Sequence, residues 1–119
     1  MKNLIACPAE RAVYFLGGKW KIRILFSLLQ NKKIRFGELK KGLKTITQQM
    51  LSKQLKELEI DGIVNRKVYQ VVPPKVEYSL TEFGLSVMPI LRSFSEWSKK
   101  NTRTIAVKLN KNFEENRII

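Results

Sequence analysis

Apolar positions recur at helical spacing through the first third of the chain. Pro8 suits the first position of a helix, and apolar residues follow it until two glycines at 17–18 end the pattern. The next segment, 19–33, has a wide apolar face and predicts a second helix. The stretch IRFGELKKGL then predicts a short extended segment followed by a short third helix.

A fourth helix begins at a capping residue. Thr47 precedes the segment QQMLSKQLKELEI, in which Leu51, Leu55 and Leu58 repeat at positions i, i+4 and i+7 of one helix face. The Asp-Gly pair at 61–62 is a typical helix end. Two short helices joined by a tight turn, of which the second is longer and polar on its outer face, form a helix-turn-helix.

The hydrophobic period then changes to that of a strand. The segments IVNRKVYQV and KVEYSL are rich in valine and tyrosine, and the prolines of VPPK between them cannot continue a strand ladder. A β-hairpin directly after a helix-turn-helix is a wing. The pattern therefore predicts a mainly α fold with a small β-hairpin wing, a winged helix-turn-helix. We expect a single domain over residues 1–119, with its core at about 7–100 and the tail 104–119 unassigned.

The hydrophobic pattern of the C-terminal part predicts one long helix over the segment EFGLSVMPILRSFSEWSKKN. Thr81 is its expected cap, and Pro89 should kink it because the missing N–H frees a backbone carbonyl one turn earlier. Apolar residues form two stripes on this helix, which is more than its own domain needs to bury. The second stripe indicates a protein partner.

Basic residues outnumber acidic ones throughout the middle of the chain. The sequence carries 23 Lys/Arg against 10 Asp/Glu, a net charge of +13 at pH 7. Residues 19–75 alone hold 14 basic and four acidic residues, a net charge of +10. Such a concentration indicates a polyanionic partner, most often nucleic acid, whereas a merely solvated basic surface is the alternative that charge alone leaves open.

The residue inventory excludes most chemistry. The chain has no histidine and one cysteine, so the commonest general base is absent and a structural zinc site cannot form. We expect no enzyme activity, no cofactor and no metal. No apolar run reaches about 18 residues, and the LIA patch at 4–6 is too short for a secretory signal. A cytoplasmic protein without a membrane partner is the resulting expectation.

The outer face of the fourth helix has the chemistry of a DNA reader. Four polar side chains lie about 100–200° from Leu51 at 100° per residue, opposite the core stripe. Glutamine pairs with adenine edges and lysine reaches guanine O6 and N7, so this face suits a major groove. Together with the first turn of the helix, it provides these candidate base-contacting residues: Gln48, Gln49, Ser52, Lys53 and Lys56.

Basic residues around this helix are candidates for contacts with the DNA backbone. They flank the preceding helix or lie on the wing: Arg35, Lys40, Lys41, Lys44, Arg66, Lys67 and Lys75. Lys75 is expected at the wing tip, as a minor-groove or backbone contact. Lys19 and Lys21 open the second helix, where they either complete a phosphate site or, as we favour, are ordinary surface lysines.

Three acids stand near the end of the fourth helix. Glu57, Glu59 and Asp61 have the residue type of metal ligands. The interpretation we favour is that they are hydrated surface acids, paired with Lys53 or Lys56 on the same helix.

The sequence resembles the HxlR-type winged-helix transcriptional regulators of bacteria and archaea in five ordered stretches: CP, LGGKWK, IRFGELKKGL, MLSKQLKELEIDGIVNRKVYQVVPPKVEYSLTEFG and LRSFSEW. The resemblance extends over residues 7–100. It implies a homodimer joined through the first and last helices, with one recognition helix on each half-site of an inverted-repeat operator in double-stranded DNA. The expected interface residues are Phe15, Leu85, Met88, Leu91, Phe94 and Trp97.

The resemblance also concerns the single cysteine. Several members of the family carry a thiol near the N-terminus that responds to quinones, aldehydes or disulfide stress, and Cys7 matches that position. As the expected N-cap of a helix that starts at Pro8, Cys7 would have its thiolate favoured by the helix dipole, an effect that Glu10 partly offsets. Cys7 is therefore a candidate redox sensor for an oxidant or small-molecule effector, and a passive, partly buried cysteine is the alternative.

Taken together, these features predict a sequence-specific, homodimeric transcriptional regulator. One alternative is a general nucleic-acid-binding or architectural protein, and another is a winged-helix module that binds an acidic protein. Preference for a palindrome over shuffled DNA separates the regulator from the architectural protein.

Overall fold

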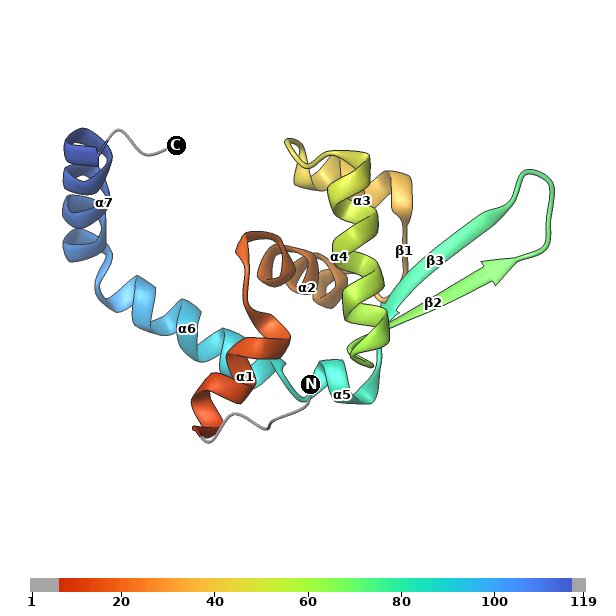
Figure 1. The fold of residues 1–119 in the computed structure, drawn as a ribbon, viewed down its shortest axis with the longest axis horizontal. Coiled ribbons are helices and arrows are strands. Elements are labelled where there is room, and N and C mark those ends of the chain that lie inside the picture. Colours follow the sequence, from red (N-terminus) through yellow and green to blue (C-terminus); the bar gives the residue numbers. More distant parts are fainter. Residues whose placement is uncertain (1–6, 117–119) are drawn as a thin grey trace. The chain divides into compact units, whose positions relative to one another are not determined.

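The computed structural model describes residues 7–116, and side chains as far as residue 110. The elements follow in the order α1 (Pro8–Leu16), α2 (Lys19–Gln30), β1 (Ile34–Arg35), α3 (Phe36–Leu43), α4 (Gln48–Ile60), β2 (Val64–Tyr69), β3 (Lys75–Leu80), α5 (Glu82–Leu85), α6 (Met88–Lys100) and α7 (Thr102–Asn116) (Figure 1). They divide into two compact units, one ending at Ser86 and the other beginning at Val87. The LIA patch at 4–6 and the last three residues of the tail lie outside the described residues.

The first unit contains the predicted helix-turn-helix, formed by α3 and α4 and packed on α2. Its core consists mainly of leucine and isoleucine side chains with less than 4% of their surface exposed: Ile24, Leu25 and Leu28 of α2, Leu39 and Leu43 of α3, and Leu51, Leu55 and Leu58 of α4. The Thr47 hydroxyl oxygen accepts a hydrogen bond from the Met50 N–H at 3.0 Å, which caps α4 as predicted. Gly62 follows the helix with φ +77°, the left-handed conformation that glycine tolerates best.

The turn between α3 and α4 contains an unusual backbone conformation. Lys44 has φ 65° and ψ −75°, and the Thr45 N–H donates to the Leu43 carbonyl at 2.8 Å across it. This is a γ-turn of the rare, strained hand, centred on a residue other than glycine. The two helices of the motif are therefore joined by a strained lysine.

The wing is part of a three-stranded antiparallel sheet with strand order β1-β3-β2. The hairpin of β2 and β3 was predicted, and its six paired positions run from Val64 opposite Leu80 to Tyr69 opposite Lys75. The two-residue β1 adds Ile34 opposite Tyr78 on the other edge of β3. In Figure 1 the hairpin extends beyond the helices of this unit.

A threonine fastens the base of the wing to the end of α4. The Thr81 hydroxyl donates to the Gly62 carbonyl at 2.6 Å, and the Thr81 N–H donates to the Ile63 carbonyl at 3.1 Å. The same hydroxyl oxygen accepts from the Gly84 N–H at 3.0 Å and so caps α5. A Cβ atom on Gly84 would collide with the Ile63 carbonyl oxygen, so this joint requires glycine. The stretch SLTEFG is thus a structural joint.

The prediction of one long C-terminal helix kinked at Pro89 is wrong. Thr81 caps the four-residue α5, and α6 begins as a separate helix with Pro89 in its first turn. Proline fits there because the first N–H groups of a helix have no intrahelical partner, whereas further inside it would remove a hydrogen bond. The unassigned tail forms α7 as far as Asn116. None of the helices in the described part of the chain is long and apolar enough to cross a membrane.

Candidate nucleic-acid interface

The predicted base-contacting residues share one exposed face of α4. All of them are exposed, whereas the core stripe of the same helix is at most 1% exposed. The helix has no acid before Glu57, so the exposed chemistry over its first two turns is amide, hydroxyl and ammonium. Such a face offers hydrogen bonds to base edges and positive charge to phosphates.

Two hollows mark this face. One lies at the start of α4 and is lined by Thr47, Gln48, Gln49 and Ser52. The other is lined by Ser52, Lys56 and Glu59 of α4 together with Arg66 of β2 and Tyr78 of β3. Because Ser52 borders both hollows, α4 and the root of the wing form one continuous surface.

The three predicted wing residues separate onto opposite faces of the sheet. Arg66 pairs with Tyr78, and Lys67 pairs with Glu77. Cross-strand partners point to the same side and successive residues alternate, so Arg66 is directed toward the α4 hollow and Lys67 away from it. Among the wing residues, Arg66 is therefore the one that borders the α4 surface.

Lys75 is engaged within the wing. It is the first residue of β3, and its ammonium lies 4.7 Å from the centre of the Tyr69 ring and 3.4 Å from a Glu77 carboxylate oxygen. Lys67 lies 4.9 Å from the same ring. A hydrogen bond from Tyr69, together with Lys75, holds the pKa of Glu77 below its ordinary value. The tip of the hairpin is formed instead by residues 70–74.

The remaining backbone candidates surround α3. Lys41 and Lys44 are exposed, and Lys40 is half-buried. Arg35 is exposed at the entry to α3, where its backbone N–H donates to Glu38 Oε1 at 3.1 Å. Arg35 also pairs with Glu77 across β1 and β3, so it shares a sheet face with Lys67 rather than with Arg66.

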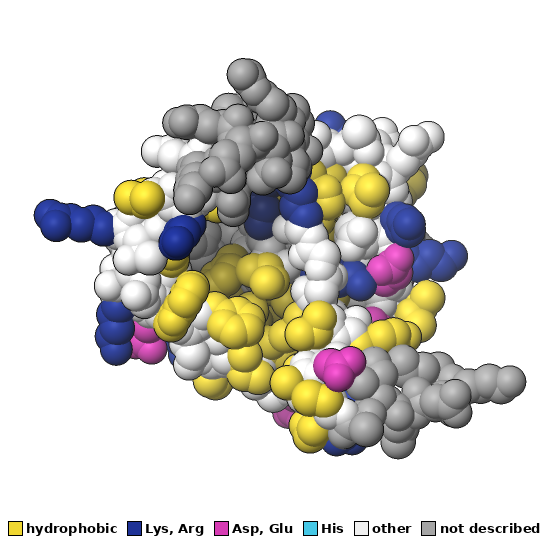
Figure 2. Space-filling model, turned by 60° about the vertical axis from the view of Figure 1, so that its left-hand side comes forward, with side chains coloured by type: hydrophobic (Ala, Val, Ile, Leu, Met, Phe, Trp, Pro, Cys, Tyr) yellow, Lys and Arg dark blue, Asp and Glu magenta, His cyan; other side chains and the backbone are white. Residues whose placement is uncertain are grey.

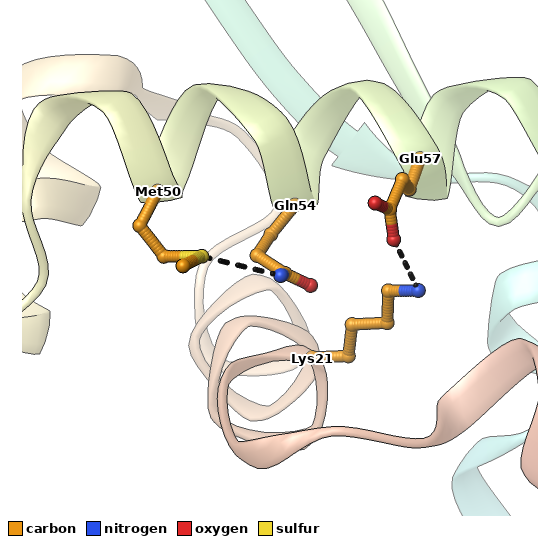
Figure 3. A network of polar contacts seen from close by, with 4 residues as sticks. All are labelled: Lys21, Met50, Gln54 and Glu57. Atoms are coloured by element: carbon orange, nitrogen blue, oxygen red, sulfur yellow. Dashed lines mark hydrogen bonds and ion pairs between the residues drawn. The ribbon is translucent and has the colours of Figure 1, made fainter.

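Both interpretations of Lys21 are wrong. Its side chain is only 9% exposed, and Nζ lies 2.8 Å from Glu57 Oε1, so the lysine links α2 to α4 (Figure 3). Glu57 therefore pairs with Lys21 rather than with the lysines of its own helix. The hydrogen bond from Lys21, with the charges of Lys21 and Lys53, holds the pKa of Glu57 below its ordinary value, although partial burial opposes this.

Beside this pair, Met50 Sδ accepts a hydrogen bond from Gln54 Nε2 at 3.4 Å (Figure 3). Lys19, the other lysine that opens α2, is exposed, and its ammonium lies 5.0 Å from the Trp20 ring. Among the described residues, no three of the histidine, cysteine and acidic side chains form a group that could hold a metal ion.

The predicted interface residues differ in exposure. Met88 and Leu91 are buried within the chain, whereas Leu85, Phe94 and Trp97 are 49–64% exposed. Phe15 is half-buried, and its ring meets the Phe83 ring edge-on at 5.9 Å. In Figure 2, apolar side chains are exposed at the surface, with lysines and arginines among them.

Cys7 is the N-cap residue of α1, as predicted, and its side chain makes no capping hydrogen bond. The thiol is exposed in the single chain. An exposed thiol at a helix N-terminus is open to oxidants and electrophiles.

The fold and the α4 surface define a winged helix-turn-helix protein. The chain belongs to the HxlR family, since residues 15–106 match the HxlR-like helix-turn-helix. The relatives are helix-turn-helix transcriptional regulators, so the chain is a regulator of this type and not an enzyme.

Known transcriptional regulators are similar over most of the chain. An uncharacterised HTH-type transcriptional regulator of Halalkalibacterium halodurans is 50% identical over 101 residues, which cover 85% of this chain and 89% of that protein. The redox regulator HypR in its reduced form is 46% identical with a TM-score of 0.80, covering 85% of this chain and 99% of that one. The reduced form of the regulator YodB from Bacillus subtilis is 34% identical with a TM-score of 0.73, covering 84% and 96%.

Proposed function

We propose that this regulator acts as a homodimer that binds double-stranded DNA at an inverted-repeat operator, with one α4 helix in the major groove of each half-site. The observation that carries the proposal is the exposed outer face of α4, where amide, hydroxyl and ammonium groups follow one another without an acid until Glu57. Because its partner is genomic DNA, we propose that the protein works in the cytoplasm.

The surroundings of α4 support the phosphate contacts that such docking needs. Lys41 and Lys44 are exposed beside the start of the helix, and Arg66 borders the hollow along its second half. Basic side chains on both sides of a recognition helix fix its register on the duplex, because phosphate contacts position a protein while base contacts specify the sequence.

Apolar side chains left exposed in the single chain support the dimer. In the second unit, Ile90, Phe94 and Trp97 are 45–64% exposed and follow one another at helical spacing along α6. In the first unit, Val13 and Tyr14 of α1 are 62% and 49% exposed. Aromatic and aliphatic side chains of this size are typical of the buried centre of a dimer interface.

The proposed function is tested by binding to the DNA upstream of the protein's own gene. A dimeric regulator should prefer a palindrome whose half-site centres lie about one helical turn apart, by roughly a thousandfold over a shuffled sequence. Fluorescence anisotropy at fixed salt measures the affinity for the palindrome and for the shuffled sequence. Light scattering gives the mass of the complex and so tests whether a dimer binds. Equal affinity for the two DNAs would instead identify an architectural protein, and the absence of DNA binding would leave the protein-interaction module.

We further propose that Cys7 makes this regulator responsive to oxidants or electrophiles. The exposed thiol at the N-cap of α1 and the similarity to HypR, known in reduced and oxidised forms, and to YodB, known after diamide treatment, support this role. With one cysteine per chain, an internal disulfide cannot form. Two Cys7 thiols of a dimer can form one disulfide, transferring two electrons and two protons to the N=N bond of the diamide, which becomes a hydrazine.

The thiol response is tested by comparing the wild type with Cys7→Ser before and after diamide or quinone treatment. Operator affinity should change in the treated wild type only, and mass spectrometry should find a disulfide or adduct at Cys7. If treatment changes the affinity of both proteins equally, or of neither, Cys7 is not the sensor.

A further inference from the structure

The tip of the wing, residues 70–74, has the opposite character to the rest of the DNA-binding surface. Its sequence is QVVPP, with no charged residue, in a chain of net charge +13. Val72 is 99% exposed and Val71 52% exposed, and the other three tip residues are exposed as well. A valine that is almost fully solvated at the end of a projecting hairpin packs against none of the residues that the structure describes.

The basic residues nearest the tip are held away from it. Lys75 lies against the Tyr69 ring and the Glu77 carboxylate at the start of β3, and Lys67 lies against the same ring from β2. Pro73 and Pro74 have no N–H and offer no donor to a phosphate. The tip can therefore contribute apolar contact but not ionic contact.

We propose that Val72 is a specificity-determining residue that enters the minor groove beside each half-site and disfavours G·C pairs there. This inference rests on the proposed function, because the tip is carried on the hairpin whose root borders the α4 surface through Arg66. The partner of the tip is duplex DNA, because the basic residues of the hairpin (Arg66, Lys67 and Lys75) and the lysines of α4 complement a polyanion. The two prolines restrict the backbone of the tip, so little conformational freedom is lost on docking.

Minor-groove chemistry explains the expected selectivity. A·T pairs present only acceptors on the groove floor, whereas G·C adds the guanine 2-amino donor. A valine side chain cannot accept that hydrogen bond, and seating it there leaves the amino group without water or partner. An apolar tip should thus favour A·T over G·C without touching any base edge in the major groove.

The experiment uses three palindromic operators that differ only in the base pairs flanking each half-site: A·T, G·C and inosine·C. Inosine keeps the major-groove edge of guanine but lacks the 2-amino group. Wild-type protein should bind the A·T and inosine operators alike and the G·C operator about fivefold to tenfold more weakly. Val72→Ser should bind the A·T operator about tenfold more weakly for each wing of the dimer that enters the minor groove. Its affinities for the three operators should also differ less from one another than those of the wild type.

Two controls separate an apolar contact from other effects. Val107→Ser removes another valine, 63% exposed on α7, and should leave all three affinities unchanged. Because Val72 neutralises no phosphate, the salt dependence of binding by Val72→Ser should match that of the wild type, whereas Lys53→Gln should flatten it.

The outcomes are distinguishable. Equal binding of the three operators by the wild type, or unchanged affinity of Val72→Ser, overturns this inference and leaves the proposed function intact. A wild type that does not prefer the palindrome overturns both. If Val72→Ser changes the oligomeric state and not the affinity for DNA, the tip contacts a second copy of the chain and the inference is wrong.

Discussion

Lys21 and Glu57 join α2 to the recognition helix, and removing either partner should have a different effect on stability. The Lys21 side chain is 9% exposed and the Glu57 side chain 42% exposed, with 2.8 Å between Nζ and Oε1. Glu57→Gln leaves a buried ammonium without its counter-charge. Lys21→Met leaves a carboxylate that water can reach, and it puts an apolar side chain into a largely buried position.

The size of the difference follows from these exposures. Removing one partner of a fully buried ion pair costs about 3–5 kcal/mol, and an exposed pair contributes about 0–1 kcal/mol. Since only the lysine is buried and glutamine can still accept a hydrogen bond from it, Glu57→Gln should lower the free energy of unfolding by about 2 kcal/mol. Lys21→Met should lower it by less than about 1 kcal/mol.

Urea unfolding at pH 7 and at one protein concentration measures both changes, with the denaturant dependence of the unfolding free energy checked for each variant. Glu59→Gln is the matched control, since Glu59 is exposed on the same helix, and it should stay within about 0.5 kcal/mol of the wild type. Equal losses for the two partners, or a larger loss for Lys21→Met, would refute the argument from burial.

The Lys21–Glu57 ion pair makes the free energy of unfolding depend on pH. The pKa of Glu57 is lowered from 4.5 in the folded chain, so its stabilisation is fully present above pH 4.5 and is lost as the pH falls through the lower, folded-state pKa. The difference in unfolding free energy between the wild type and Glu57→Gln should therefore shrink below pH 4.5. A difference that stays constant down to pH 3 would contradict the assignment.

Three further substitutions test other parts of the structure. Gly84→Ala should cost about 2 kcal/mol of unfolding free energy, because the new Cβ collides with the Ile63 carbonyl oxygen; a neutral result in urea would show that the joint is loose. Lys44→Gly should raise the free energy of unfolding by about 1 kcal/mol, because glycine adopts the positive φ without strain. The same variant should bind the operator more weakly in anisotropy, and a lower free energy of unfolding would contradict the assignment of backbone strain to Lys44. Arg66→Gln should weaken operator binding more than Lys67→Gln, because only Arg66 borders the α4 hollow; the reverse order would contradict the assignment of the sheet faces.

The sequence predicts those parts of the fold that depend on local patterns. Thr47 and Gly62 mark the ends of α4 because capping and left-handed φ are properties of single residues. The wing follows from a change of hydrophobic period. The local pattern does not decide the role of Pro89, because a proline can either kink a helix or lie in the first turn of a new one. Packing against residues beyond its sequence neighbours decides between the two.

Tertiary contacts account for the side-chain assignments that the sequence misses. Local rules pair Glu57 with lysines one turn away on its own helix, but the partner comes from another helix. The sequence does contain an indication that Lys21 is buried, because Lys21 shares a helix face with Leu25 and Leu28, which are both buried. Arg66 and Lys67 look alike in a charge count, and only the strand register assigns them to opposite faces.

The central claim, that the outer face of α4 binds the operator, is tested most directly by reversing its charge. The double variant Lys53→Glu, Lys56→Glu should lose specific operator binding in anisotropy while keeping its helical circular dichroism and its dimer mass. The pair Lys99→Glu, Lys100→Glu makes the same change in net charge at the exposed end of α6 and should keep its preference for the palindrome over shuffled DNA. Unchanged operator affinity in the α4 variant, or equal losses in the two variants, would contradict the account.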